Sequence, residues 1–195
     1  MLELGSFDDA RRKVLAEAQS RLAGIKRVVA EPYESIDAAM AALSTVRRQA
    51  QEYLNQIQHE QMMIAAAEWL VRHSAGGVPL RWLWNPRHSG DRGGPDLVGL
   101  EGDAMRVCAE VSAQEDAVGV VDAQMRRALI RLAGQEGRRF YFVRTVSMKR
   151  RAVTKIVKAG WDIAVVHITL QPDLPGLVQN APLASLAATR SAVAR

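Results

Sequence analysis

The chain has 195 residues, of which 48% are hydrophobic and 24% charged, a composition typical of a folded globular protein. No apolar run reaches the roughly 18 residues needed to cross a bilayer, and the N-terminus lacks the pattern of a signal peptide, so we expect a cytoplasmic protein with no membrane partner. A single cysteine, Cys108, excludes an internal disulfide and a zinc site built from cysteines.

The N-terminal third predicts two long helices. Ser6 followed by Asp9 is typical of a helix start, and apolar residues at helical spacing extend this helix to about Ala30. Pro32 ends it, and a second helix is predicted over 35–73. That second helix carries an apolar stripe at seven-residue intervals: Ile36, Leu43, Ala50, Ile57, Ile64 and Val71. The stripe can pack on the chain's own core or on a second copy, and we expect a homodimer.

After Gly76 and Gly77 the pattern changes to short β-like runs separated by helices. The predicted strands are 78–84, 95–100, 104–111, 139–145 and 162–168, and the predicted helices are 118–134 and 148–159. This order predicts an α/β fold with a mixed central sheet flanked by helices. We divide the chain into a helical N-terminal region (1–56), an α/β core (57–168) and a C-terminal extension (169–195).

Two carboxylates in the predicted sheet are candidate metal ligands. Asp96 stands at the start of one strand and Glu110 near the end of its hairpin partner, where apolar residues surround both. A turn at 101–103 would bring the two side chains close together at one end of the sheet. Buried carboxylates are costly unless they are paired, hydrogen-bonded or bound to a cation. Carboxylate oxygens suit Mg²⁺, which is the cofactor that we expect here.

The residues Gly94-Pro95-Asp96 and Glu110-Val111-Ser112, within this order of elements, resemble the PD-(D/E)XK nuclease superfamily, whose fold many type II restriction endonucleases share. The resemblance covers residues 57–168 and implies a restriction endonuclease-like core. It also implies Mg²⁺-dependent hydrolysis of double-stranded DNA, with Asp96, Glu110 and the carbonyl of Val111 as metal ligands. Products with 5′-phosphate and 3′-hydroxyl ends would follow.

This chain departs from the superfamily pattern at one catalytic position. The family usually has lysine two residues after the glutamate, where this sequence has Ser112. Ser112 can hydrogen-bond the attacking water, whereas Gln114 or a cation from elsewhere, such as Lys149, would supply the electrostatic role. The alternative is an inactive site kept as a DNA-binding fold. Glu60 and Glu68 are either outer metal ligands or ordinary helix-surface salt-bridging residues.

Positive charge is concentrated late in the chain. Residues 121–160 contain eleven Lys and Arg but only two acidic residues, which favours an anionic partner. Within this block and near the carboxylates, the candidate DNA-contacting residues are Arg87, His88, Arg92, Gln114, Lys149, Arg150 and Arg151. An exposed connector or a solvated basic surface would look similar.

These features together predict a Mg²⁺-dependent DNA endonuclease, of the sequence-specific type II restriction class, with Asp96, Glu110 and Ser112 as catalytic residues. Two alternatives remain open: an inactive nuclease-fold module that binds DNA or regulates another protein, and a repair or junction-resolving nuclease. The sequence gives no recognition site and no cut position.

Overall fold

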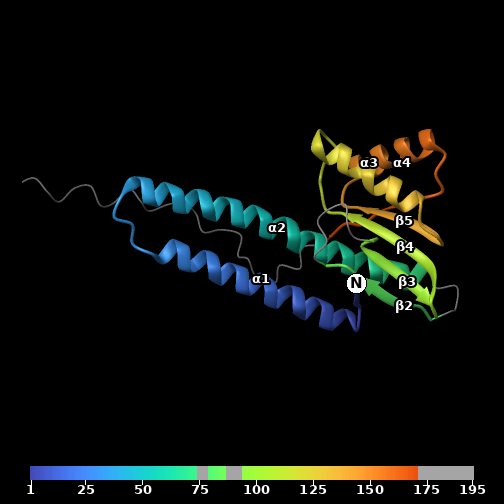
Figure 1. Cartoon of the computed structure of the whole chain (residues 1–195), viewed down its shortest axis with the longest axis horizontal. Helices are drawn as coiled ribbons and strands as arrows, with labels where there is room; N and C mark the ends of the chain where they lie inside the picture. The colour runs from blue at the N-terminus through green and yellow to red at the C-terminus, as the bar shows by residue number, and fades with distance from the viewer. Residues whose placement is uncertain (74–78, 87–93, 171–195) are drawn as a thin grey trace, which may run out of the picture.

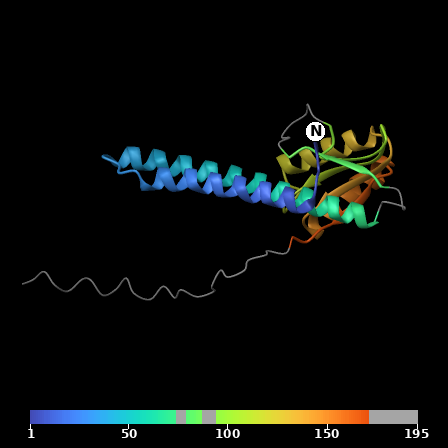
Figure 2. The ribbon, with the colours of Figure 1, turned by 90° about the horizontal axis from the view of Figure 1, so that it is seen from below.

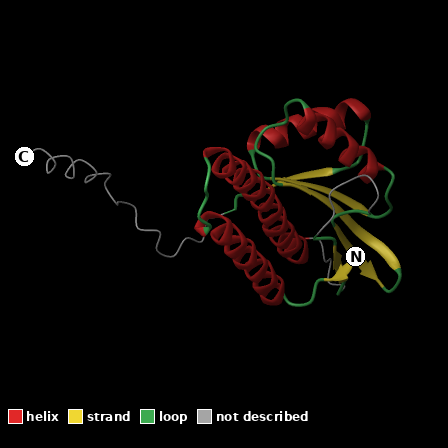
Figure 3. Cartoon of the chain, turned by 60° about the vertical axis from the view of Figure 1, so that its left-hand side comes forward, coloured by secondary structure: helices red, strands yellow, loops and turns green. Residues whose placement is uncertain are grey.

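The computed structural model describes residues 1–73, 79–86 and 94–170. These residues form a six-stranded sheet and four helices, two of which make a long hairpin that projects from the sheet (Figures 1 and 3). The elements are β1 (Leu2–Glu3), α1 (Phe7–Ala30), α2 (Ile36–His73), β2 (Arg81–Trp84), β3 (Leu97–Glu101), β4 (Ala104–Ser112), α3 (Val120–Ala133), β5 (Arg138–Val143), α4 (Val146–Ala159) and β6 (Ala164–His167). The expected elements are all present, with ends shifted by three residues or fewer, whereas β1 was not expected.

The sheet is mixed, as the order of elements predicts. Its strands follow the sequence order β1 to β6, and neighbouring strands are antiparallel from β1 to β4 and parallel from β4 to β6. The parallel β4–β5 and β5–β6 connections run through α3 and α4, as parallel pairs require. The general α/β class with a mixed sheet is therefore confirmed.

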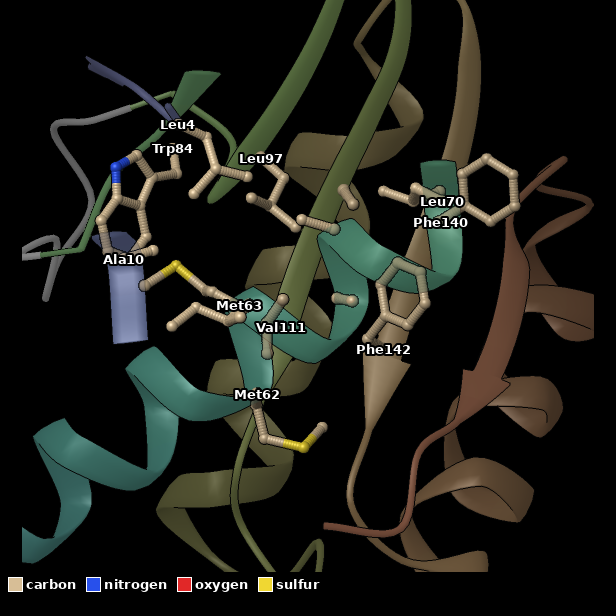
Figure 4. Packing of buried hydrophobic residues seen from close by; sticks show 14 of the residues in the cluster. Leu4, Ala10, Met62, Met63, Leu70, Trp84, Leu97, Val111, Phe140 and Phe142 are labelled. Atoms are coloured by element: carbon tan, nitrogen blue, oxygen red, sulfur yellow. The ribbon is translucent and has the colours of Figure 1, made fainter. Parts of the chain in front are cut away.

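Helices cover both faces of the sheet. On one face, Met62, Met63 and Leu70 of α2 pack against Leu97 and Phe142 (Figure 4). On the other face, α3 and α4 pack against the sheet through a second buried cluster, which contains Cys108, Met125, Leu129, Leu132, Tyr141, Met148 and Ile156. Because side chains alternate along a strand, β4 sends Val107, Ala109 and Val111 toward α2, and residues 108, 110 and 112 toward α3 and α4.

The long hairpin of α1 and α2 begins at a capped terminus. Ser6 precedes α1, and its hydroxyl accepts a hydrogen bond from the backbone N–H of Asp9 at 3.1 Å. Residues 31–35 turn the chain back, so that α1 runs antiparallel to the first part of α2, and the two helices extend beyond the sheet (Figure 2). No helix in the described part of the chain is long and apolar enough to cross a membrane.

The heptad stripe of α2 divides into two parts. Ile57 and Ile64 belong to the core between α2 and the sheet. Near the tip of the hairpin, however, Ile36 is 82% exposed and Leu43 is 61% exposed. The apolar pattern therefore lies in the core where α2 covers the sheet and on the surface near the tip of the hairpin, because α2 is longer than the sheet that it covers.

Candidate active site

Asp96, which immediately precedes β3, lies opposite Glu110 of the adjacent strand β4. The antiparallel register pairs Leu97 with Ala109, and one further step places Asp96 opposite Glu110. Both residues are only 5% exposed. The backbone N–H of Val111 donates a hydrogen bond to Oδ2 of Asp96 at 2.8 Å. The turn between β3 and β4, together with a register shift between Gly99 and Leu100, thus brings the two acidic side chains to one end of the sheet, on the same side of it.

Both carboxylates line a cavity of about 580 Å³ between α2, the sheet and α3. Its polar lining residues are Glu52, Asn55, Gln56, His59, Asp96, Glu110, Ser112, Gln114, Gln124, Arg127, Arg131 and Tyr141. The cavity opens to solvent, so it can admit a group attached to a larger ligand. It combines two buried anions with two arginines, a distribution suited to a cation and a phosphate together.

Arg131 of α3 neutralises Glu110 directly. Its Nε and one terminal guanidinium nitrogen lie 3.2 and 3.1 Å from the two carboxylate oxygens of Glu110. Burial and the negative charge of Asp96 nevertheless raise the pKa of Glu110 to about 7, with Arg131 opposing the shift. Two acidic groups in one cavity thus repel each other, and one arginine offsets only part of that repulsion.

His59 of α2 lies beside Asp96, a contact that the sequence patterns did not predict. Its Nε2 is 3.4 Å from Oδ2 of Asp96. Burial lowers the pKa of His59, but hydrogen bonding to Asp96, the Asp96 charge and a hydrogen bond to the Val111 backbone outweigh it, so the net pKa is raised. The imidazole therefore contacts two of the groups that the resemblance assigns to a metal.

The remaining α2 residues at the cavity share a simple spacing. Glu52, Asn55, Gln56 and His59 follow an i, i+3, i+4, i+7 pattern, so one side of the helix faces the cavity. This polar stripe is readable from the sequence, but it was missed because the apolar positions of the same helix define its more obvious pattern.

Ser112 and Gln114 line the cavity, whereas Lys149 does not. Ser112 hydrogen-bonds to Tyr141, whose pKa is raised by burial. Lys149, which the sequence offered beside Gln114 as one possible source of the electrostatic role, lies on α4 and is not among the residues that line the cavity. Arg127 and Arg131 of α3 bring the positive charge instead.

Of the two alternatives for Glu60 and Glu68, an outer metal ligand or a salt-bridging helix residue, the second describes Glu68, and Glu60 is buried in the helical layer. Glu60 is 2% exposed, accepts a hydrogen bond from Gln56 at 2.9 Å and does not line the cavity. Its burial raises its pKa. Glu68 pairs with Arg11 of α1, which ties the base of the hairpin to α2. Both glutamates therefore act within the helical layer.

Part of the basic block is neutralised inside the protein. Arg151 and Lys155 both bind Asp122, at 2.8 and 2.9 Å. Arg144 pairs with Glu115 and Arg139 with Asp162. Within the described ranges, Arg126, Arg127, Lys149, Arg150 and Lys158 have no ion-pair partner. Arg87, His88 and Arg92 lie outside the described residues.

The donor set suits a hard divalent cation. Two carboxylates and the Val111 carbonyl are oxygen donors, and the mutual repulsion of Asp96 and Glu110 would be relieved by a cation between them. Among residues 1–73, 79–86 and 94–170, no group of three or more His, Cys, Asp and Glu side chains is arranged as a metal site. A Mg²⁺ ion here would therefore rely on water and substrate oxygens as well.

Comparisons with protein-family models, curated proteins and solved structures find no match to this chain.

Proposed function

We propose that this protein is a Mg²⁺-dependent DNA endonuclease of the sequence-specific restriction type. The observation that carries the proposal is the pair of buried carboxylates, Asp96 and Glu110, on adjacent strands in one open cavity with two arginines. The order of elements also supports the proposal. A helix, three antiparallel strands, a helix and a parallel strand follow one another along the chain around the site, which is the order that the superfamily resemblance implies.

The surroundings of the cavity suit a nucleic acid. Arg127 and Gln124 project from α3 into the cavity, where an arginine can bind a phosphate and a glutamine can bind a phosphate or a base edge. Arg126 lies on the same helix and is exposed, without an ion-pair partner in the part of the chain that is described. Positive charge is thus available to neutralise the DNA backbone beside the carboxylates.

Five side chains of the cavity and one backbone carbonyl have roles in the proposed phosphodiester hydrolysis. Asp96, Glu110 and the Val111 carbonyl would hold Mg²⁺, which when bound activates water and offsets negative charge on the phosphate. His59 orients the Asp96 carboxylate through Nε2. Ser112 can hydrogen-bond the attacking water. Arg131 takes the electrostatic role that lysine has in the superfamily, because its guanidinium is fixed against Glu110 at the cavity wall.

Cleavage of supercoiled plasmid, with and without Mg²⁺, tests the proposal. We expect nicking and linearisation that require the metal, and a fall of at least about 100-fold in Asp96→Ala and Glu110→Ala. Asp103→Ala is the matched control, since it removes an exposed carboxylate from the turn of the same hairpin. Equal cleavage by all four proteins would point to a contaminating nuclease and overturn the proposal.

A second candidate function rests on Ser112 and on the pairing of Glu110 with Arg131. A site without the motif lysine, whose glutamate is already held by an arginine, also fits a nuclease fold that binds DNA without cutting it. Binding of a duplex measured by fluorescence anisotropy, together with no cleavage in Mg²⁺ or Mn²⁺, would favour this module. Discrete fragments from a long natural DNA would favour restriction, whereas preferential cutting of branched DNA would favour junction resolution.

A further inference from the structure

Helix α1 exposes an apolar stripe to solvent. Leu15, Leu22 and Val29 recur every seven residues and are 58%, 61% and 63% exposed. Scattered exposed leucines are ordinary on protein surfaces. A periodic series along about 20 Å of helix is different, because it forms one continuous edge.

The first part of α2 exposes a matching stripe. Ile36, Met40, Leu43 and Leu54 are 82%, 57%, 61% and 51% exposed. They lie along the segment of α2 that runs beside α1, beyond the part that covers the sheet (Figure 1).

The two stripes lie on the same side of the hairpin. Each exposed α1 residue directly follows an inward-facing position, namely 14, 21 or 28, and Met40, Leu43 and Leu54 follow the inward positions 39, 42 and 53 in the same way. One residue turns a helix by about 100°. Because α1 and α2 are antiparallel and face each other, a rotation of about 100° past the inward position points to the same side of the hairpin on both helices.

The other side of the hairpin is polar and holds the cavity. Residues that directly precede the inward positions include Lys13, Ser20 and Arg27 on α1 and Glu52 on α2, all of them exposed. Glu52 lines the candidate active site. The apolar stripes therefore face away from the DNA-binding cavity.

We infer that this face, formed by Leu15, Leu22, Val29, Ile36, Met40, Leu43 and Leu54, binds the same face of a second copy of the chain. Two antiparallel hairpins packed by such faces form a four-helix bundle with two-fold symmetry, in which each stripe meets its counterpart. On α1 the stripe recurs every seven residues, whereas on α2 only Ile36 and Leu43 share that spacing. Met40 and Leu54 lie on the same side of α2, with the exposed Arg47 midway between them. Apolar residues repeated along one side of both helices are the pattern that such a bundle buries.

Charge and size favour a second copy over other partners. Residues 7–60 contain eight basic and eight acidic side chains, so two hairpins carry no net charge that would drive them apart, and the hairpin as a whole has no positive excess to attract DNA or an anionic membrane. Two helices about 36 Å long and about 10 Å in diameter present roughly 700 Å². A stable protein interface needs about 800 Å² from each partner. The full hairpin therefore comes close to the size that a dimer requires.

The dimer leaves both cavities open, because each lies on the opposite side of its hairpin. Two sites in one particle would match the two strands of a duplex, and that consequence alone rests on the proposed nuclease function.

Sedimentation velocity of the full chain without DNA or metal tests the inference. We expect the wild-type protein to have the mass of two chains at micromolar concentration. Leu22→Glu combined with Leu43→Glu places charge at the centre of the face and should raise the dissociation constant at least about 100-fold. Circular dichroism checks that each variant keeps its helices.

The matched control adds the same two charges to the opposite side of the same helices, as Ser20→Glu with Ala41→Glu, both at exposed positions. This variant should remain a dimer. A wild-type protein that is monomeric up to about 100 µM, a Leu22/Leu43 variant that stays dimeric, or a control that dissociates equally would each overturn the inference. Since no step uses DNA cleavage, its failure is distinct from failure of the proposed function.

Discussion

The sheet and the hairpin violate the usual distribution of polar and apolar residues in opposite ways. In the sheet, Asp96 and Glu110 are 5% exposed where an apolar residue would pack at no electrostatic cost. In the hairpin, Leu22 and Ile36 are 61% and 82% exposed where a polar residue would be more soluble. Neither departure helps an isolated chain to fold. Each departure carries one of the two proposals: a cation and a phosphate would offset the buried carboxylates at the sheet, and a second copy of the chain would cover the apolar face of the hairpin.

The largest effect separates a true core residue from an exposed residue of the hairpin. Phe142 is fully buried between α2 and the sheet, so Phe142→Ala should lower the free energy of unfolding by about 3–5 kcal/mol at any protein concentration. Leu22→Ala should cost little at low concentration and more where dimers form. Urea denaturation at two protein concentrations measures both. An equal, concentration-independent loss in the two variants would contradict the assignment of Leu22 to an interface.

The next effect concerns the arginine that the cavity supplies in place of a lysine. Under the proposed function, Arg131→Ala should reduce DNA cleavage by about 10²–10³-fold, because it removes the cation that is held against Glu110 and would stabilise the charge of the reacting phosphate. Arg131→Lys should restore part of the rate. Single-turnover cleavage of a labelled duplex measures both variants.

The control for Arg131 is Arg126→Ala, which removes an exposed cation from the same helix but outside the cavity. It should weaken DNA binding slightly and leave the single-turnover rate unchanged. If Arg131→Ala leaves the cleavage rate unchanged, Ser112 and Gln114 would be sufficient to take the role of the missing lysine.

Sequence patterns predicted most of the fold because the signals were local. Helix starts such as Ser6 and glycine-bounded strands depend on neighbouring residues, and their predicted positions agree with the structure to within three residues. Strand β1 was missed because two residues carry no alternation. That Asp96 and Glu110 lie close together was predictable from the turn at 101–103, but their direct pairing was not, because a register shift between Gly99 and Leu100 moves the strand pairing by one residue.

The rest of the candidate site depends on tertiary packing. His59 and Glu52 face the cavity only because the second half of α2 packs on the sheet and fixes the rotation of the whole helix. Arg131 reaches Glu110 from α3, 21 residues further along the chain. In the sequence, Arg131 looks like one of many surface cations. The directions in which His59, Glu52 and Arg131 point could not be predicted without knowing how the helical layers pack on the sheet.

A smaller effect is expected at the turn that leads from α3 into β5. Gly137 has φ of +74°, and a Cβ atom there would lie 2.6 Å from the backbone oxygen of Arg106 on β4. Gly137→Ala should therefore lower the free energy of unfolding by about 2–3 kcal/mol. Gly102, with φ of +58° and open space around it, is the matched control and should cost about 1 kcal/mol. Thermal unfolding of both variants tests the difference, and equal losses would show that the contact with Arg106 is unimportant.

The smallest effect tests a charge that is neither buried in the sheet nor part of an apolar face. Asp122 lies on α3, where hydrogen bonds from Arg151 and Lys155 of α4 lower its pKa from 3.8 to about 2. Because the folded-state pKa is below the unfolded value, the ionised group stabilises the fold above about pH 4, and this contribution disappears as the pH falls through about 2. Asp122→Asn should thus lower Tm slightly at pH 7, with the difference from wild type shrinking toward pH 2. Salt should reduce the same difference, since Asp122, Arg151 and Lys155 are all partly exposed to solvent. A Tm difference that is independent of pH and salt would contradict this explanation. It would mean that Asp122→Asn disturbs the packing of α3 on α4 instead of removing ion pairs.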